Sequence, residues 1–284
     1  MFNSIYIYGL GMMGGSLARS IKEMNISNKV YAYDTDKKSL SYAKKYKIID
    51  NYDNTNFKYL SDADLIIICT PVSCYKAIFR NIKKFKKSNA IITDIGSTKS
   101  TIIDGYNSVF KNNEGSFIGS HPLTGKESSS VINSDLDVFK NSVILITPIE
   151  NKDSNLAKTI SKFWKKFNCQ IFTIDPKTHD LVLSETSHLP HLVSFALVNI
   201  ILNTKSIDNI SDYIGGGFKD FARLAHSDSK MWRDICFSNE KNIIRSINLL
   251  KKELDLIKSL VSNKDKRLAK YLRDIKIKLE QNDK

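Results

Sequence analysis

A histidine at the predicted end of a strand is the residue in this sequence best suited to proton chemistry. His121 follows the predicted strand Ser116–Ser120 and precedes Pro122, which holds the histidine in an extended conformation. A neutral imidazole accepts a proton from a substrate hydroxyl near neutral pH, as the oxidation of an alcohol by hydride transfer requires. We therefore predict that His121 is a catalytic base, with a purely structural histidine as the alternative.

Two more polar residues follow another predicted strand, Ala90–Asp94. Ser97 and Lys99 come shortly after this strand. Because the carboxyl ends of parallel strands meet at one edge of a sheet, both side chains are expected to face the same crevice. By position alone, a serine that caps a helix and a solvated lysine are equally good interpretations.

A glycine-rich turn near the N-terminus predicts a dinucleotide site. Residues 9–14 read G-x-G-x-x-G between the predicted strand Ser4–Tyr8 and the predicted helix Met13–Met24. The glycines allow a tight turn and let backbone N–H groups reach a pyrophosphate at the helix N-terminus. Asp34 ends the next strand, where a carboxylate binds the ribose hydroxyls of NAD and would repel the 2′-phosphate of NADP. Thr70-Pro71 ends an apolar strand at the same edge. The predicted NAD-binding residues are Gly9, Leu10, Gly11, Met12, Met13, Gly14, Asp34, Thr70 and Pro71.

The second half of the chain carries an arginine suited to a substrate carboxylate. Arg223 follows the glycine run Gly215–Gly217, and it is one of only seven arginines. Its planar guanidinium fork matches a carboxylate in a bidentate manner. The alternative is a surface ion pair with Asp220 or Asp228.

Two histidines of the second half raise the question of a metal. His188 and His191 lie three residues apart on one helical face, and Glu185 precedes His188 by three. The trio lacks an obvious further ligand and any H-E-x-x-H pattern. We therefore predict no metal, and a buried, hydrogen-bonded structural role for His188.

The periodicity of the chain predicts the scaffold that positions these residues. Strand and helix patterns alternate up to Asp175-Pro176, and helical periodicity dominates beyond. We expect an α/β fold with a Rossmann-type NAD-binding domain at 1–175 and an all-helical domain at 176–284. The predicted strands are Ser4–Tyr8, Lys29–Tyr33, Asp64–Thr70, Ala90–Asp94, Ser116–Ser120, Ser142–Thr147 and Gln170–Ile174. The predicted helices are Met13–Met24, Lys37–Lys45, Ser73–Phe85, Ser154–Phe167, Lys177–Asn203, Asp208–Tyr213, Phe218–Ala225, Ser229–Ser262 and Lys266–Leu279.

Composition narrows the class of protein. The 284 residues carry a net charge of +13, but the basic residues are mostly lysines spread along the whole chain, so we expect no nucleic-acid partner. Four cysteines without a C-x-x-C pair fit a reducing compartment. No unbroken apolar run reaches the ~18 residues of a membrane span, and the N-terminus lacks the features of a signal peptide. We expect a cytoplasmic protein with no membrane partner.

Several motifs in one order make the chain resemble the prephenate/arogenate dehydrogenase family over nearly its full length. They are G-L-G-M-M-G-G-S-L-A at 9–18, D-I-G-S-T-K at 94–99, S-H-P-L-T-G at 120–125, S-H-L-P-H-L at 187–192, G-G-G-F at 215–218 and M-W-R-D at 231–234. The resemblance implies NAD-dependent oxidative decarboxylation of prephenate to 4-hydroxyphenylpyruvate, in tyrosine biosynthesis. It also implies that the helical domain at 176–284 is a substrate and dimerisation domain, through which the chain forms a homodimer.

The resemblance implies a role for each matched site residue. His121 matches the catalytic base, Ser97 the serine that orients it, and Arg223 the arginine that binds a substrate carboxylate. His191 and Gly216 match substrate-pocket positions, and Glu127 matches a substrate-binding residue at the pocket entrance. Thr124 and Ser130 depart from the residues that the family often has beside the pocket, which leaves substrate preference open.

Three alternatives remain open. Arogenate is the nearest alternative substrate and would give tyrosine directly. A β-hydroxyacid dehydrogenase uses a lysine with an asparagine four residues later, a spacing that Lys205 and Asn209 have without the glycine-rich segment before them. A dinucleotide-sensing module without catalysis is the third, and it would leave His121, Ser97 and Arg223 without a task.

Overall fold

The computed structural model describes residues 2–111, 116–126, 130–149, 154–203 and 213–282. The chain forms two compact units, Met1–Asn239 and Glu240–Lys284. These units do not follow the expected boundary at residue 175, which remains a prediction about functional domains.

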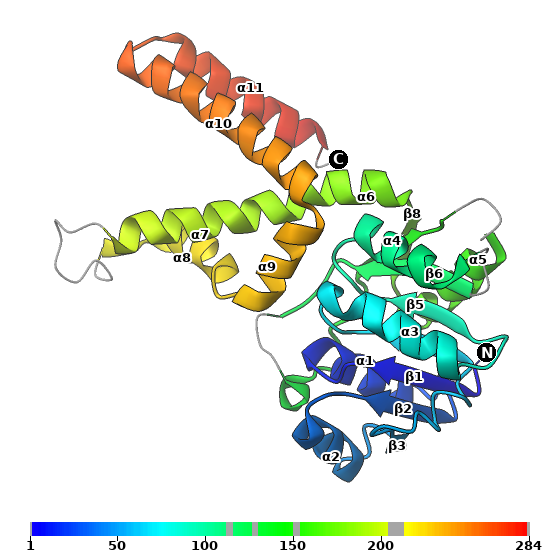
Figure 1. Ribbon diagram of the computed structural model, residues 1–284. Helices are drawn as coiled ribbons and strands as arrows, with labels where there is room; N and C mark the ends of the chain where they lie inside the picture. Colours follow the sequence, from blue (N-terminus) through cyan, green and yellow to red (C-terminus); the bar gives the residue numbers. More distant parts are fainter. Residues whose placement is uncertain (1, 112–115, 127–129, 150–153, 204–212, 283–284) are drawn as a thin grey trace. The chain divides into compact units, whose positions relative to one another are not determined.

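An eight-stranded sheet forms the centre of the first unit (Figure 1). The strand order is β3-β2-β1-β4-β5-β6-β7-β8, and every neighbouring pair is parallel except β6 and β7. The first six positions give the order 3-2-1-4-5-6 of a Rossmann fold, which confirms the predicted fold class. The strands are β1 Ser4–Tyr8, β2 Lys29–Tyr33, β3 Asn51–Tyr52, β4 Leu65–Ile68, β5 Ile91–Asp94, β6 Ser116–Pro122, β7 Val143–Thr147 and β8 Gln170–Thr173.

Alternating side chains of the central strands build an apolar layer on each face of the sheet. In β1, Ile5 and Ile7 belong to one buried cluster, whereas Tyr6 and Tyr8 belong to the other. Helices α1, α2 and α5 cover the first face, and α3 and α4 lie side by side over the second. These helices are α1 Met12–Glu23, α2 Lys37–Lys45, α3 Tyr75–Phe85, α4 Ser100–Val109 and α5 Ser154–Trp164.

Helices make up the rest of the first unit. They are α6 Pro176–Leu183, α7 Leu189–Leu202, α8 Gly216–Leu224 and α9 Ser229–Ser238, with a π-helical segment, Ser184–His188, between α6 and α7. The predicted helix Lys177–Asn203 is therefore continuous but wider over one turn. The predicted helix Asp208–Tyr213 lies almost wholly outside the described residues.

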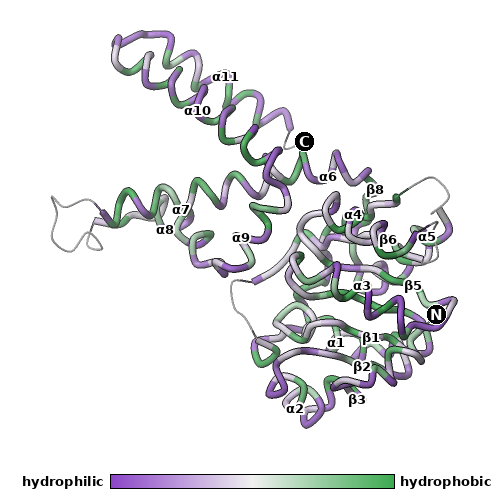
Figure 2. The backbone as a smooth tube through the Cα atoms, viewed as in Figure 1, coloured by the Kyte–Doolittle hydropathy of each residue, from purple (hydrophilic) through white to green (hydrophobic). Residues whose placement is uncertain are grey.

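The segment Pro176–Leu202 is long and apolar enough to cross a membrane by length and composition alone. Only 22% of its most apolar window is buried inside the protein. Figure 2 shows the hydrophobic stretches along α7. Ile200 and Leu202, each 65% exposed, contribute to this apolar surface.

The second unit is a pair of helices, α10 Glu240–Ser262 and α11 Arg267–Asn282. Tyr271 of α11 donates a hydrogen bond to the Glu253 carboxylate of α10, with 2.7 Å between the oxygens. The prediction of one helix over Ser229–Ser262 is wrong, because the chain leaves helical geometry at Asn239 (φ −121°, ψ 30°). The Asn239 side chain instead donates to the carbonyl oxygen of Asp180 at 2.7 Å.

Candidate active site

The glycine-rich turn between β1 and α1 has the geometry that a dinucleotide needs. Gly9 has φ +93°, and a Cβ there would lie 2.8 Å from the carbonyl oxygen of Cys69. A Cβ on Gly14 would lie 1.9 Å from the Gly9 carbonyl oxygen, so α1 packs directly against the turn. Gly11 has open space around it and caps α1 without a side-chain hydrogen bond. The N-terminus of α1 therefore fits a pyrophosphate.

Asp34 lies directly beside this turn. Its carboxylate accepts hydrogen bonds from the backbone N–H groups of Leu10, at 2.6 Å, and Asp36, at 2.7 Å. The half-buried carboxylate thus holds the glycine turn at the end of β2. Its position next to the turn is compatible with the predicted contact to a ribose.

The remaining predicted cofactor residues surround the same turn. Met12 is buried and Met13 half-buried at the start of α1. The methyl group of Thr70 lies 2.9 Å from where a Gly9 Cβ would stand, and Pro71 is exposed just beyond it. The structure thus brings the predicted cofactor-binding residues of β1, β2 and β4 to one edge of the sheet.

A buried carboxylate at the end of β5 organises the loop that carries Ser97. Asp94 accepts hydrogen bonds from Gly96 N–H at 2.9 Å, from Ser120 N–H at 3.1 Å and from the Tyr75 hydroxyl at 3.2 Å. The Lys99 ammonium lies 2.6 Å from the same carboxylate and also donates to the Gly96 carbonyl oxygen at 2.8 Å. These bonds hold the start of the loop, at Gly96 and Lys99, against the end of β5.

The expectation that Lys99 faces the crevice is wrong. Its side chain is fully buried and forms an ion pair with Asp94, which is equally buried. Burial lowers the pKa of Lys99, while the Asp94 charge and hydrogen bond oppose this shift. Loss of one partner of such a pair typically costs about 3–5 kcal/mol, because the other charge stays buried. Lys99 is a structural ion.

Ser97 lies half-buried on the loop between β5 and α4. On the same loop, the Thr98 hydroxyl donates to Ser238 of α9 at 3.1 Å. From the first turn of α4, Thr101 donates to the carbonyl oxygen of Ser238 at 2.7 Å. The loop that carries Ser97 is thus held on one side by Asp94 and on the other by α9.

His121, near the end of β6, joins a buried hydrogen-bonded cluster. Its Nδ1 lies 2.9 Å from Nε2 of His179, and Nδ1 of His179 lies 2.9 Å from Oδ1 of Asp180. Burial is the main cause that holds the pKa of His121 well below its usual range, and the charges of His179, Lys99 and His188 act in the same direction. The imidazole is therefore neutral near pH 7 and can accept a proton.

The Asp180 carboxylate ties this cluster to α4. It accepts hydrogen bonds from the backbone N–H groups of Lys99 and Ser100, each at 2.8 Å. These N–H groups open α4, so Asp180 caps a helix that lies 80 residues away in sequence. The sequence interpretation missed both His179 and Asp180. The adjacent His-Asp pair just inside a helix was the available signal.

A buried polar atom of the helical part, Nε1 of Trp232, has no hydrogen-bond partner within the described structure. The nearby ring of His188 interacts with the backbone of Ser97. Asn239 lies 3.2 Å from Nδ1 of His188, and burial lowers the pKa of His188 to about 4. His191 stacks on Trp232 with 4.0 Å between the ring centroids. A buried group left unpaired marks a place where a ligand can bind.

The other predicted substrate residues lie on α8 or outside the described chain. Gly216 begins α8 and Arg223 lies in its last turn, and both are exposed. The Ser194 hydroxyl of α7 donates to the Phe221 carbonyl oxygen, which fixes α8 against α7. Glu127 lies outside the described residues, as do Lys205 and Asn209.

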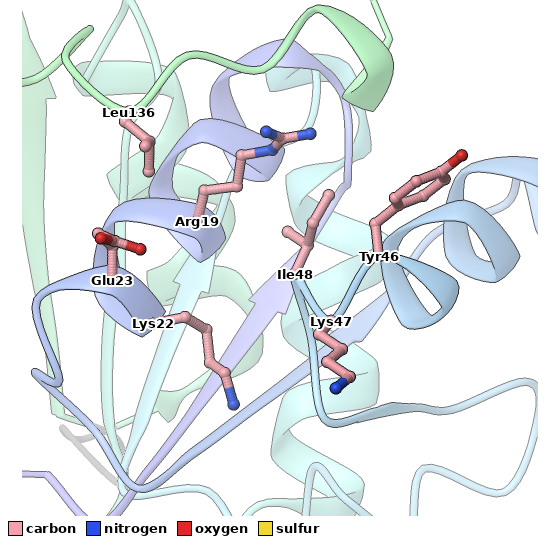
Figure 3. A pocket seen from close by; sticks show the side chains of 7 residues that line it. All are labelled: Arg19, Lys22, Glu23, Tyr46, Lys47, Ile48 and Leu136. Atoms are coloured by element: carbon pink, nitrogen blue, oxygen red, sulfur yellow. The ribbon is translucent and has the colours of Figure 1, made fainter.

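A separate surface pocket of about 330 Å³ lies where α1 meets the end of α2 (Figure 3). None of the predicted site residues lines it. Lys22, at its edge, is already paired with Asp50 at 2.7 Å. Its lining residues are Arg19, Lys22, Glu23, Tyr46, Lys47, Ile48 and Leu136. Within the described residues, no group of three His, Cys, Asp or Glu side chains is placed to hold a metal ion.

Two family models together match most of the chain. A family model described as prephenate dehydrogenase, nucleotide-binding domain, matches residues 17–173, and one described as prephenate dehydrogenase, dimerization domain, matches residues 175–274. Prephenate dehydrogenase from Lactococcus lactis is 30% identical over 94% of this chain and 73% of its own length. Cyclohexadienyl dehydrogenase from Zymomonas mobilis is 27% identical over 93% of this chain and 90% of its own length.

A solved structure is similar over the whole chain. The crystal structure of prephenate dehydrogenase from Aquifex aeolicus, in complex with hydroxyphenyl propionate and NAD+, is 32% identical. The match covers 99% of this chain and 98% of that chain, with a TM-score of 0.89. With a glycine turn shaped for a dinucleotide and a buried neutral histidine at the same edge of the sheet, the chain belongs to the prephenate dehydrogenase family of oxidoreductases.

Proposed function

We propose that the protein catalyses the NAD-dependent oxidative decarboxylation of prephenate to 4-hydroxyphenylpyruvate. The observation that carries this proposal is the neutral, buried imidazole of His121 near the carboxyl end of β6. Because β1, β4, β5 and β6 are parallel neighbours, this strand end and the glycine turn share one edge of the sheet.

The reaction needs a hydride acceptor, a proton acceptor and a bound substrate. NAD, when bound, supplies the hydride acceptor. His121 takes the proton of the ring hydroxyl as hydride leaves the same carbon. Loss of the ring carboxylate as carbon dioxide then makes the ring aromatic, which supplies a large driving force. The protein must hold the substrate in place and accept one proton.

The substrate-binding roles stay proposals for each residue. Ser97 orients the hydroxyl and His121, and Arg223 pairs with a substrate carboxylate. His191, Gly216 and Glu127 complete the pocket. The support for His191 is its stacking on Trp232, whose buried Nε1 has no hydrogen-bond partner within the described residues.

Two finer choices follow from single features. NAD is preferred over NADP, because Asp34 stands beside the glycine turn where a 2′-phosphate would be repelled. Arogenate is the alternative substrate, alone or together with prephenate. The matched relative from Zymomonas mobilis, a cyclohexadienyl dehydrogenase, keeps this alternative open.

The expected assembly is a homodimer in the cytoplasm. The support for the dimer is the dimerization-domain model matched at residues 175–274 and the exposed apolar side chains of the helical part. The expected partner is a small anionic substrate, and the diffuse positive charge of the chain favours such a ligand.

The test is a steady-state assay of the purified protein in which prephenate and arogenate are each offered with NAD and with NADP. We expect NADH formation with prephenate, release of carbon dioxide and 4-hydroxyphenylpyruvate as product. Faster turnover with arogenate would replace the substrate assignment, and faster turnover with NADP would overturn the role of Asp34. Cofactor binding without turnover of either substrate would instead favour a sensing module.

A further inference from the structure

A row of three buried side chains begins at the proposed base, His121, and ends at the start of helix α4. His121, His179 and Asp180 are 9%, 0% and 1% exposed, and their polar atoms follow one another at 2.9 Å. We propose that His179 and Asp180 are positioning residues that fix the tautomer of His121, with its Nδ1 protonated and its Nε2 bare as the proton acceptor. This inference rests on the proposed role of His121.

Asp180, the last member of this series of hydrogen bonds, determines which atom donates at each step. Asp180 accepts from the backbone N–H groups of Lys99 and Ser100, which are donors and nothing else. Burial alone would raise the pKa of Asp180, but hydrogen bonds from His179 and Ser100 bring it below its usual value. Asp180 is therefore a carboxylate, which only accepts hydrogen bonds.

The tautomers of the two histidines follow from this carboxylate. Nδ1 of His179 faces Oδ1 of Asp180 and must carry a hydrogen to donate. Burial lowers the pKa of His179, so the ring is neutral and its Nε2 has a free lone pair. This nitrogen accepts from His121, whose Nδ1 therefore carries the hydrogen. In the neutral ring of His121, the lone pair is left on Nε2.

This arrangement suits a base in two ways. The bare Nε2 is available without any prior proton shift. When Nε2 takes the substrate proton, the Nδ1–H of the new imidazolium still donates to His179, whose other nitrogen donates to Asp180. The negative carboxylate then stabilises the positive ring through His179, and no proton needs to move along the chain.

Other charges surround the same cluster. The Lys99 ammonium disfavours protonation of His121, and so would a positive charge on His179 or His188. Asp94 neutralises Lys99 at 2.6 Å, and Asp180 is the carboxylate that acts through His179. The pH dependence of the base thus depends on all of these groups, so the tautomer itself is the more direct quantity to measure.

Nitrogen NMR of the full-length protein labelled with ¹⁵N-histidine measures the tautomer without substrate. The five histidines of the chain make the spectrum assignable, and His121→Asn identifies the signals of His121. At pH 7 we expect a protonated-type signal for Nδ1 and a bare-type signal for Nε2 in both His121 and His179. A protonated Nε2 in wild-type His121 overturns the proposal, whatever the activity of the enzyme.

Kinetics of two variants test the consequence. His179→Phe keeps the ring shape but removes the acceptor, so we expect kcat to fall about 10²-fold, within the range that a positioned base contributes, with the KM for NAD unchanged. His179→Gln can present a carbonyl oxygen to His121, and we expect it to recover at least part of kcat and the wild-type tautomer. Exposed His226→Gln is the matched control, expected to change neither.

The outcomes separate the two proposals. If the wild-type tautomer is as expected but neither prephenate nor arogenate is oxidised, the proposed function fails and the tautomer assignment stands. If the enzyme is active and His179→Phe retains full kcat, the positioning role is overturned. If the Phe variant does not fold, the wild-type spectrum and the Gln variant still decide.

Discussion

Burial and hydrogen bonding act together on the imidazole of His121. Burial disfavours its charged form, and a neighbouring histidine holds one nitrogen. Replacement by asparagine removes the base but keeps some hydrogen-bonding capacity. We expect His121→Asn to lower kcat by roughly 10²–10⁴-fold, with a smaller change in the KM for prephenate.

Steady-state kinetics measures this effect. His226→Asn is the control, because His226 is exposed. In the wild type, activity should fall on the acid side only well below pH 6.5, since protonation removes the acceptor and burial depresses the pKa of His121. An unchanged kcat in His121→Asn would remove this residue from the mechanism.

At this scale the sequence predicted the residues that local motifs mark and missed those that depend on distant contacts. The glycine turn and Asp34 were predictable because a strand, a turn and a second strand follow one another closely. His179 was not, because its contact with His121 joins residues 58 apart in sequence. The burial of Lys99 was also missed, since a lysine after a strand is usually solvated.

Among the elements, α8 bears the proposed carboxylate-binding group. Arg223 is exposed and lies in the last turn of α8. A hydrogen bond from Ser194 of α7 to Phe221 holds α8 against α7. Removing a charge-assisted bond to a carboxylate costs about 1.5–3 kcal/mol. We expect Arg223→Ala to raise the KM for prephenate roughly ten- to a few hundred-fold and to leave the KM for NAD almost unchanged.

Arg80→Ala is the matched control, because Arg80 is exposed on α3. Arg223→Lys should recover only part of the affinity, since an ammonium lacks the planar fork. If Arg223 forms only a surface ion pair, its loss costs under about 1 kcal/mol of stability and leaves the kinetics intact. An unchanged KM for prephenate in Arg223→Ala would thus defeat the carboxylate role.

The elements that sequence reasoning missed or misjudged depend on tertiary contacts. The sequence predicted no helix over Ser100–Val109, where α4 lies, and the N-terminus of α4 is capped by Asp180 from far along the chain. The break between α9 and α10 at Asn239 carries no proline or glycine. At this break the Asn239 side chain donates a hydrogen bond to the carbonyl oxygen of Asp180 and lies 3.2 Å from Nδ1 of His188. These contacts hold Asn239 in a non-helical conformation. Neither signal is local.

For the whole molecule, the buried histidines make stability depend on pH. Burial lowers the pKa of His188 to about 4, and those of His121 and His179 are also depressed. An unfolded histidine titrates near 6.5, so between this pH and 4 the unfolded chain binds protons that the folded chain does not. The free energy of unfolding therefore falls as the pH falls. His188 alone contributes about 3 kcal/mol over this interval.

Urea unfolding at pH 7, 6 and 5 measures this dependence. We expect His188→Gln to flatten it, whereas exposed His226→Gln should leave it as in the wild type. The pKa of the buried carboxyl group of Asp180 is below its usual range. Protonation of Asp180 therefore lowers the free energy of unfolding at a lower pH than protonation of the histidines does. A slope unaffected by His188→Gln would show that His188 is not held neutral by the fold.

Exposed apolar side chains on the helices favour association of two copies of the chain. Leu254 on α10 is 54% exposed and Ile200 on α7 is 65% exposed, and several neighbours are similarly open. The other exposed large apolar side chains of α7, α10 and α11 are Leu202, Ile244, Ile247, Leu249, Leu256, Val261, Leu272, Ile275, Ile277 and Leu279. So many exposed apolar side chains are unusual on a monomer, and we expect those of α10 and α11 to take part in an interface between two copies of the chain.

We expect the wild type to sediment as a dimer at micromolar concentration. A double variant, Ile247→Glu with Leu254→Glu, places two charges seven residues apart on one face of α10 and should weaken the dimer at least about tenfold, or 1.4 kcal/mol. Tyr46→Glu is the control, because Tyr46 is a 56% exposed aromatic at the end of α2. A wild type that sediments as a monomer with full activity would show that the apolar faces serve another purpose. A double variant that stays dimeric would move the interface away from this face of α10.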